Sequence, residues 1–238
     1  MKAMVLAAGL GTRLRPLTND RPKALVEVAG RALLEIALTR VHDFGVHEAI
    51  VNTHHFAEMI WAYLKEHDNF GMRIEISHED ELLDTGGGLK KAAWFFLESG
   101  DSGEPFLLHN VDVISTVDLG RMLQFHKQQS ALATMAVQDR TTSRPLLFDE
   151  SGRLRGRAGK SERVTDGGKI QALAFSGIHV ISPRIFSLLS ETGVFSIIDA
   201  YLRLSEQGEK ITAFRADEYR WRDLGKPESV TEAAREFA

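Results

Sequence analysis

Residues able to bind phosphate are concentrated near the N-terminus. A short apolar run, Ala3 to Ala8, ends at Gly9. Four cations then fall within eleven positions, opposed by one acid, Asp20: Arg13, Arg15, Arg21 and Lys23. A strand that enters a glycine turn lets backbone amides approach a phosphate chain, and converging cations neutralise its charge. These residues predict a polyphosphate site in the loop after a buried first strand.

The spacing in this loop differs from two other phosphate-binding motifs. Gly9-Leu10-Gly11-Thr12-Arg13-Leu14 lacks the third glycine of the dinucleotide fingerprint, and no helix is predicted to open there. The lysine and hydroxyl order of a Walker A loop is also missing. A nicotinamide-dependent oxidoreductase is therefore the weaker alternative. An ordinary glycine turn does not explain Thr12-Arg13, Pro16 and Pro22-Lys23 together.

Strands and helices are predicted to alternate around this loop. The predicted strands are 3–8, 48–52, 72–77, 105–109, 130–137, 172–181, 211–214 and 218–222, with a brief extended piece at 24–28. The predicted helices are 33–41, 57–66, 89–97, 117–128, 183–189, 196–206 and 227–237. This order implies parallel crossovers and an α/β fold with a Rossmann-like, doubly wound, mixed but mainly parallel sheet.

The pattern is looser over residues 139–170. Short strand candidates at 146–148 and 153–157 predict a small antiparallel flap or insertion, and 160–168 is expected to be a mobile loop. No repeat or linker divides the chain, so one domain is expected over residues 1–238. Four aromatic residues are predicted to lie in the core: Trp61, Trp94, Phe95 and Phe96.

Composition narrows the class of protein. The chain has 238 residues, 43% of them hydrophobic and 26% charged, as in ordinary globular proteins. A net charge of −4 argues against nucleic acid as the main partner, because proteins that bind it usually carry a basic face. The absence of cysteine excludes disulfides and thiol catalysis. The apolar start is too short for a signal peptide or a membrane span, so a cytoplasmic protein with no membrane partner is expected.

Several ordered motifs run through the chain. The longest is Leu6-Ala7-Ala8-Gly9-Leu10-Gly11-Thr12-Arg13-Leu14-Arg15-Pro16-Leu17-Thr18, followed by Arg21-Pro22-Lys23-Ala24-Leu25 and Val28-Ala29-Gly30-Arg31-Ala32-Leu33-Leu34. The others are Asp84-Thr85-Gly86-Gly87-Gly88, Asn110-Val111-Asp112, Phe175-Ser176-Gly177-Ile178 and Trp221-Arg222-Asp223-Leu224-Gly225. Together they resemble the sugar-1-phosphate nucleotidyltransferases, in particular the short, single-domain bacterial members. Those members include N-acetylmuramate-1-phosphate uridylyltransferases and mannose- or heptose-1-phosphate guanylyltransferases.

The resemblance implies a reaction in which an NTP and a sugar 1-phosphate give an NDP-sugar and pyrophosphate. A phosphate monoester is already ionised near neutral pH, so the reaction requires no general base. By resemblance, Arg13 would hold the β- and γ-phosphates and Lys23 the α-phosphate region. The residues implied to bind nucleotide are Leu6, Ala8, Gly9, Gly11, Thr12, Arg13, Lys23, Asn52, Gly86 and Gly87. Gly86 to Gly88 also fit a helix N-terminal turn capped by Thr85, and the two interpretations are compatible.

The metal and sugar sites implied by the resemblance use residues from the middle and end of the chain. Asp112 and Asp223 would bind Mg²⁺ between the nucleotide and the sugar phosphate, as suits a hard cation that prefers oxygen ligands. With Arg13 and Lys23, these two aspartates form the expected catalytic set. Asp112 follows a predicted strand, where open α/β sheets place ligand groups. Asn110, Ser176 and Gly177 would contact the sugar.

Three positions depart from the family pattern and leave the sugar open. Val111 replaces a glycine that often precedes the metal aspartate, and Lys226 replaces a common threonine. No Glu-Lys-Pro element is evident, so Lys160, Ser161 and Glu162 are the weaker sugar candidates. The first expectation is UTP with N-acetylmuramate 1-phosphate, and the alternative is a mannose- or heptose-1-phosphate guanylyltransferase. A non-catalytic relative that binds an NDP-sugar is the alternative from another class, and a monomer or small homo-oligomer is expected.

Overall fold

The computed structural model of the chain describes residues 1–98, 103–159 and 169–237. The strands are β1 (Lys2–Leu6), β2 (Glu27–Val28), β3 (Arg31–Ala32), β4 (Glu48–Thr53), β5 (Arg73–His78), β6 (Phe106–Asn110), β7 (Val113–Ser115), β8 (Ala133–Gln138), β9 (Leu146–Phe148), β10 (Leu154–Arg157), β11 (Gln171–Ile181), β12 (Ile211–Arg215) and β13 (Trp221–Asp223). The α-helices are α1 (Leu33–Asp43), α2 (Ala57–Glu66), α3 (Asp84–Lys91), α4 (Ala93–Leu97), α5 (Leu119–Gln129), α6 (Ile185–Leu188), α7 (Ile197–Glu206) and α8 (Pro227–Phe237). The loop expected at 160–168, with the sugar candidates Lys160, Ser161 and Glu162, lies outside the described residues.

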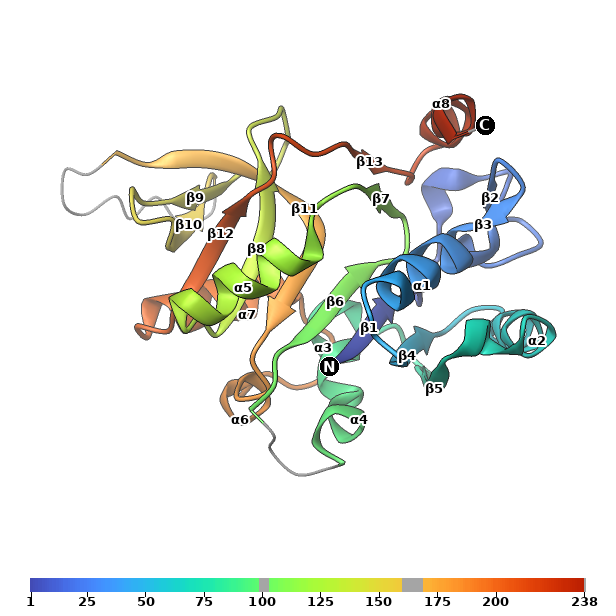
Figure 1. Cartoon of the computed structure of the whole chain (residues 1–238), viewed down its shortest axis with the longest axis horizontal. Helices are drawn as coiled ribbons and strands as arrows, with labels where there is room; N and C mark the ends of the chain where they lie inside the picture. Colours follow the sequence, from blue (N-terminus) through green and yellow to red (C-terminus); the bar gives the residue numbers. More distant parts are fainter. Residues whose placement is uncertain (99–102, 160–168, 238) are drawn as a thin grey trace.

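A nine-stranded sheet forms the centre of the described structure (Figure 1). Its path runs β10-β9-β11-β6-β1-β4-β5, and β8 and β12 continue from β11. β1, β4, β5 and β6 run parallel to one another, whereas β11 runs antiparallel to β6 and β8. The predicted mixed, mainly parallel sheet is confirmed. Antiparallel pairing of β9 with β10 and with β11 extends its far edge.

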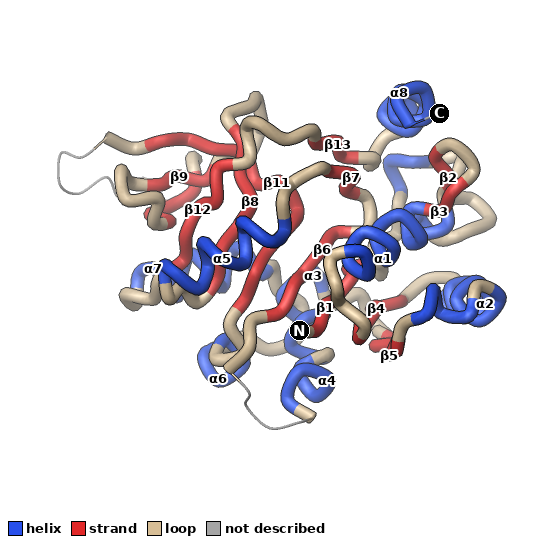
Figure 2. The backbone as a smooth tube through the Cα atoms, in the orientation of Figure 1, coloured by secondary structure: helices blue, strands red, loops and turns tan. Residues whose placement is uncertain are grey.

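Helices cover both faces of the sheet and enclose two apolar clusters (Figure 2). Successive side chains of a strand point to opposite faces, so Ala3 and Val5 of β1 join one cluster and Met4 joins the other. α1, α2, α5 and α8 contribute to the first cluster, and α3, α4, α6 and α7 to the second. Both faces of the central strands are buried, as a doubly wound sheet requires.

Some local predictions need correction. The extended piece expected at 24–28 begins as a 3₁₀ turn, Lys23–Leu25, and the strand expected at 218–222 lies at 221–223. Trp61 and Trp94, predicted to be core, are 44% and 49% exposed, whereas Phe95 and Phe96 are buried. A tryptophan on an amphipathic helix packs inward only if it falls on the buried stripe, and the two tryptophans lie outside it.

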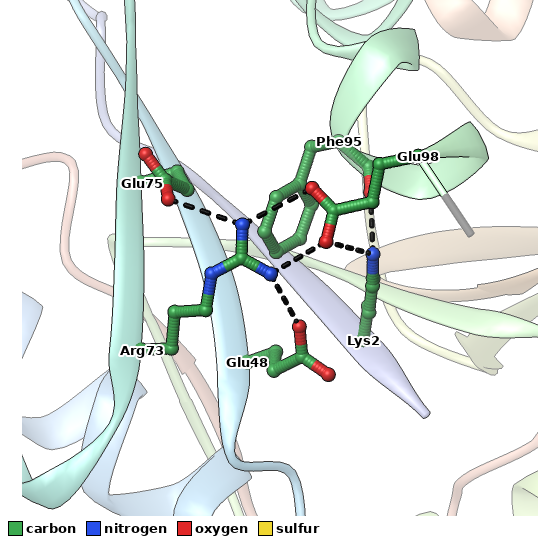
Figure 3. A network of polar contacts seen from close by, with 6 residues as sticks. All are labelled: Lys2, Glu48, Arg73, Glu75, Phe95 and Glu98. Carbon is green, nitrogen blue, oxygen red and sulfur yellow. Dashed lines mark hydrogen bonds and ion pairs between the residues drawn. The ribbon is translucent and has the colours of Figure 1, made fainter.

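An ion-pair network joins the amino-terminal ends of the parallel strands to α4 (Figure 3). Arg73 of β5 donates to Glu48 of β4, to Glu75 and to Glu98, and Glu98 also pairs with Lys2 of β1. The Arg73 hydrogen bonds lower the pKa of Glu98 to about 2. The side chains of Arg73, Glu48 and Glu75 are exposed, so the ion pairs of Arg73 align the strand ends and contribute little stability. The carboxyl ends of the parallel strands, at the opposite edge of the sheet, take no part in this network.

The glycine-rich segment is part of α3, which begins at Asp84 rather than at the predicted residue 89. The backbone N–H of Gly86 donates to the Phe195 carbonyl oxygen at 2.9 Å, immediately before α7. A Cβ atom on Gly86 would lie 2.4 Å from the Phe195 ring, and one on Gly87 would lie 2.5 Å from the Gly193 carbonyl oxygen. These two glycines therefore let α3 pack closely against the segment that leads into α7.

Replacement of Gly86 by alanine is expected to lower the free energy of unfolding by about 1–3 kcal/mol, because the methyl group forces this contact apart. Urea unfolding measures the loss. The matched control is Gly9→Ala, since a Cβ atom there meets nothing within 4 Å, and its effect should stay within about 0.5 kcal/mol. A Gly86→Ala protein with unchanged stability and an altered KM for nucleotide would contradict the packing role.

Two completely buried histidines lie side by side in the sheet. His109 of β6 pairs with Ile178 of β11, next to His179. Burial lowers the pKa of His109 to about 4 and that of His179 to about 3. Both imidazoles are therefore neutral in the folded protein at pH 5, where the same groups in the unfolded chain, with a pKa near 6.5, are largely protonated.

The free energy of unfolding is expected to fall as the pH is lowered from 7 to 5, by about 2 kcal/mol for each of these histidines. The unfolded chain binds protons in this window and the folded chain does not, so acid favours unfolding. Urea unfolding at the two pH values measures the difference. The exposed His47 provides the control, because His47→Gln should leave the pH dependence unchanged. Equal stability at pH 5 and pH 7 would refute the expectation.

In the part of the chain that the structure describes, no helix is both long and apolar enough to cross a membrane.

Candidate active site

The loop after β1 presents backbone donors at the carboxyl edge of the sheet. Among the described residues, the N–H groups of Gly9, Leu10, Gly11 and Thr12 have no hydrogen-bond partner. Gly9, Leu10, Thr12 and Arg13 are exposed, as a loop that receives a ligand must be. Unpaired, accessible amides in a glycine turn suit an anion. We refer to residues 9–13 as the phosphate loop.

Gly11 fixes the shape of this loop. Its φ is +65°, a left-handed conformation that favours glycine. A Cβ atom there would lie 3.0 Å from the Cβ of Lys23 and from Cγ2 of Thr18, and the Thr18 hydroxyl donates to the Gly11 carbonyl oxygen at 2.9 Å. The glycine therefore allows Lys23 to lie directly against the loop. Arg15 and Arg21 are exposed to solvent, and Lys23 is the cation that packs against the loop.

Lys23 and Asp112 form an ion pair that joins the phosphate loop to the end of β6. The Lys23 ammonium donates to Oδ2 of Asp112, and only 12% and 14% of the two side chains are exposed. Asp112 lies just beyond β6, and the N–H of Val111 donates to the Leu6 carbonyl oxygen of β1 at 3.1 Å. Two of the four predicted catalytic residues are thus in direct contact.

Asp223 reaches the same place through a pairing that sequence reasoning missed. β7 was not predicted, yet it pairs antiparallel with β13, and Asp223 faces Val113, the residue after Asp112. The N–H of Leu224 also donates to the Asp112 carbonyl oxygen at 2.8 Å. The short ribbon of β7 and β13 therefore holds the two aspartates together across more than a hundred positions of sequence (Figure 1).

Arg13 completes the set. A Cβ atom on Gly225 would lie 2.6 Å from Oδ1 of Asp223 and 2.9 Å from Nη2 of Arg13. Both side chains therefore border the same backbone atom, and only a glycine leaves them room. Arg13, Lys23, Asp112 and Asp223 come from three distant parts of the chain and meet at one edge of the sheet.

The aspartate pair has oxygens available for a metal. Oδ2 of Asp112 accepts from Lys23 and Oδ1 of Asp223 accepts from the Gly225 N–H, whereas the second oxygen of each has no hydrogen-bond partner among the described residues. Within the same residues, no group of three acidic or histidine side chains surrounds a metal position. This donor set fits a Mg²⁺ ion that takes one or two carboxylates from the protein and further oxygens from phosphates.

Asn52 and Glu79 join the first strands beneath the phosphate loop. Oδ1 of Asn52 accepts from the Ala7 N–H at 2.7 Å, and its amide donates to the buried Glu79 carboxylate at 2.7 Å. Glu79 also accepts from the Leu83 N–H, just before α3. Asn52 is 3% exposed, so its side chain supports the loop from within the protein. Its predicted contact with nucleotide stays a prediction. Glu79 had no motif that could have indicated it.

The three residues predicted to contact sugar lie together. A Cβ atom on Gly177 would lie 2.7 Å from Val113 and 3.1 Å from the Asn110 amide, and its φ is +75°. Ser176 is completely buried, and its carbonyl oxygen accepts from the Trp221 indole at 2.7 Å. Asn110 and Gly177 line a cavity of about 350 Å³ beside Asp223.

Arginines that no motif singled out line this cavity. Arg140 stacks on the Trp221 ring, 3.6 Å from its centroid, and donates to the Phe175 carbonyl oxygen at 2.7 Å. Burial lowers its pKa, and the nearby Asp223 partly offsets the shift. Arg144 and Arg157 line the same cavity, and both also line an adjoining one of about 430 Å³ that includes Asp84 and Asp199. Isolated arginines in a loosely patterned segment carry no sequence signal.

Comparison with known proteins agrees with this geometry. The sequence pattern of the family described as "Nucleotidyl transferase" matches residues 2–238. The chain belongs to this family. It is 36% identical over 244 residues to the N-acetylmuramate alpha-1-phosphate uridylyltransferase of Caulobacter vibrioides, covering 99% of this chain and 96% of the relative. The prediction that the chain is an enzyme of the sugar-1-phosphate nucleotidyltransferase class is confirmed.

Other relatives and solved structures extend the comparison. A probable mannose-1-phosphate guanylyltransferase of Oryza sativa is 29% identical, and the match covers 95% of this chain but 62% of that protein. HddC from Yersinia pseudotuberculosis, solved in complex with GMP-PN, superposes with a TM-score of 0.77 over 100% of this chain and 99% of that one at 21% identity. A UDP-glucose pyrophosphorylase in complex with UDP-glucose gives 0.80, covering 99% of this chain and 97% of that one at 19% identity. At these identities the likeness confirms the fold.

Replacing Asp112 by asparagine is expected to lower kcat by at least about 10²-fold, the scale of losing a dedicated charge-stabilising group. The amide keeps the shape and removes the charge that balances Lys23. Pyrophosphate release with the preferred substrates measures the effect, and thermal unfolding checks the fold. Asp20→Asn is the matched control, because Asp20 is exposed and, among the residues that the structure describes, pairs only with Arg21. Near-normal turnover of Asp112→Asn would exclude the assignment.

Proposed function

We propose that the chain transfers a nucleotidyl group from an NTP to a sugar 1-phosphate and releases pyrophosphate. The observation that carries the proposal is the meeting of Arg13, the Lys23–Asp112 pair and Asp223 beside the unpaired amides of the phosphate loop. Cations and backbone donors for a triphosphate lie next to carboxylates for a metal, and a cavity suited to a sugar opens beside them. The four residues are proposed as the catalytic set.

In the proposed mechanism, an oxygen of the sugar phosphate attacks the α-phosphorus, and the bond from that phosphorus to the β-phosphate oxygen breaks. The attacking oxygen is already ionised, so the residues position two anions in line and neutralise their charge. Arg13 and the amides of the phosphate loop bind the β- and γ-phosphates, and Lys23 binds the α-phosphate. Asp112 and Asp223 would hold Mg²⁺, which would supply positive charge to offset the negative charge of the two phosphate groups.

The nucleotide contacts are proposed in two parts. Leu6, Ala8, Gly9, Gly11 and Thr12 belong to the strand end and loop that face the triphosphate. Gly86 and Gly87 lie at the start of α3, where their N–H groups donate to Phe195, so they are proposed to shape the nucleotide side by packing. Asn52 supports the same side through Ala7 and Glu79.

The first-choice substrates are UTP and N-acetylmuramate 1-phosphate. The similarity to the Caulobacter uridylyltransferase extends over nearly the whole of both chains, whereas the Oryza guanylyltransferase named above is a longer protein. A mannose- or heptose-1-phosphate guanylyltransferase is the second candidate. The proposed sugar contacts are Asn110, Ser176 and Gly177.

A screen of the four common NTPs against a panel of sugar 1-phosphates, read by pyrophosphate release in the presence of Mg²⁺, tests this function. We expect the highest kcat/KM with UTP and N-acetylmuramate 1-phosphate. A chelator should abolish release, and excess Mg²⁺ should restore it. Preference for GTP with mannose 1-phosphate would select the second candidate, and no release with any pair would favour a non-catalytic NDP-sugar-binding protein.

A further inference from the structure

Two adjoining cavities, one of them lined by Asp223, meet around a pair of arginines. Six residues line both of them: Asn110, Arg144, Arg157, Phe175, Ser196 and Ile198. Asn110 lies two positions before Asp112, so one end of the combined space lies at the proposed site of phosphate transfer. Arg144 and Arg157 therefore face whatever part of the sugar extends into this space.

Arg157 is a largely buried cation with little to balance it. Its side chain is 16% exposed, and its only ion pair among the described residues is with Oδ1 of Asp199 at 3.8 Å. That distance is too long for a hydrogen bond, and Asp199 is 52% exposed. Within the same part of the chain its guanidinium donates no hydrogen bond. A guanidinium whose side chain is mostly covered, and whose five donors have no acceptor in the described residues, is available to an anionic group of a ligand.

Arg144 lies beside it. Arg157 pairs with Leu146 across the β9–β10 ribbon, and the N–H of Ala158 donates to the carbonyl oxygen of Pro145 at 3.1 Å. Arg144, directly before this proline, is thus brought near Arg157 on the ribbon that borders the cavity. No hydrogen bond or ion pair engages the Arg144 guanidinium within the described part of the chain.

The transferred phosphate does not account for these two arginines. Arg140 stacks on Trp221 and lies close enough to Asp223 for its pKa to respond to that carboxylate, so it already supplies a cation beside the proposed metal position. Arg13 and Lys23 serve the triphosphate. A second anionic group on the sugar would give Arg144 and Arg157 the acceptors they lack, and planar guanidinium groups match a carboxylate well.

We propose that Arg144 and Arg157 bind a carboxylate on the sugar, and that the enzyme is built for an acidic sugar 1-phosphate. This inference rests on the proposed function and adds the chemical feature by which the substrate is chosen. A site built to pair a charged group discriminates strongly against the analogue that lacks it.

The test compares two sugars that differ by the acidic group: N-acetylmuramate 1-phosphate and N-acetylglucosamine 1-phosphate, each with UTP. In Arg144→Gln and Arg157→Gln, we expect the ratio of kcat/KM for the acidic sugar to that for the neutral sugar to fall about 10- to 100-fold, through KM for the acidic sugar. Arg155→Gln is the matched control, because Arg155 lies on the same strand, is exposed and bonds to Asp149. Its ratio should equal that of the wild type.

Calorimetric binding of the two sugar phosphates to the wild-type protein separates this inference from the proposed function. If the wild-type protein shows no turnover but binds the acidic sugar phosphate more tightly than the neutral one, and Arg157→Gln reduces this preference, the proposed function would be rejected and the carboxylate site supported. An unchanged ratio in both variants, an equal loss for both sugars, or no affinity for the acidic sugar over the neutral one would overturn the inference. If Arg157→Lys still prefers the acidic sugar, but less strongly than the wild type does, the result would further support a guanidinium that pairs with two oxygens.

Discussion

The ion pair between Lys23 and Asp112 is the interaction on which the site depends. It connects the first loop of the chain to the end of β6, and its two charges neutralise one another in a place where little solvent reaches. Either charge alone would be costly to keep there, since a partly buried ion that loses its partner is strongly destabilising. The pair therefore fixes the spacing between the first loop, with its cations and unpaired amides, and the carboxylates that follow β6 and end β13.

Around this pair, contacts with the backbone fix the positions of the other side chains. Glycines at 11, 177 and 225 allow side chains from distant segments to touch main chain, and each would collide with a neighbour if it carried a Cβ atom. Asn52 and Glu79 join β1, β4 and the start of α3 through buried hydrogen bonds. Such a scaffold holds side chains from distant segments in fixed relative positions, which suits a reaction that needs positioning and charge neutralisation more than proton transfer.

The cations of the candidate site fall into two groups that differ in their origin in the chain. Those of the first loop come from a dense motif, whereas Arg140, Arg144 and Arg157 come from the segment around the antiparallel extension of the sheet and line the cavity beside Asp223. An extension at the sheet edge can vary without disturbing the central strands, so it is a suitable place for substrate choice. In the proposed function, the central strands would position the reacting groups and the appended ribbon would distinguish among sugars.

The sequence by itself determined the family and the alternation of strands and helices, and it predicted four catalytic residues that the structure brings together. It could do so because buried parallel strands, amphipathic helices and glycine–cation motifs are local patterns in the chain. The tertiary structure decided what depends on contacts between distant segments. It supplied the β7–β13 ribbon that joins Asp112 to Asp223, the inclusion of Gly86 in α3, the exposure of Trp61, and the arginines of the cavity. A three-residue strand is stable only when its partner strand is present. The role of an isolated arginine can be inferred only from the cavity that its side chain lines.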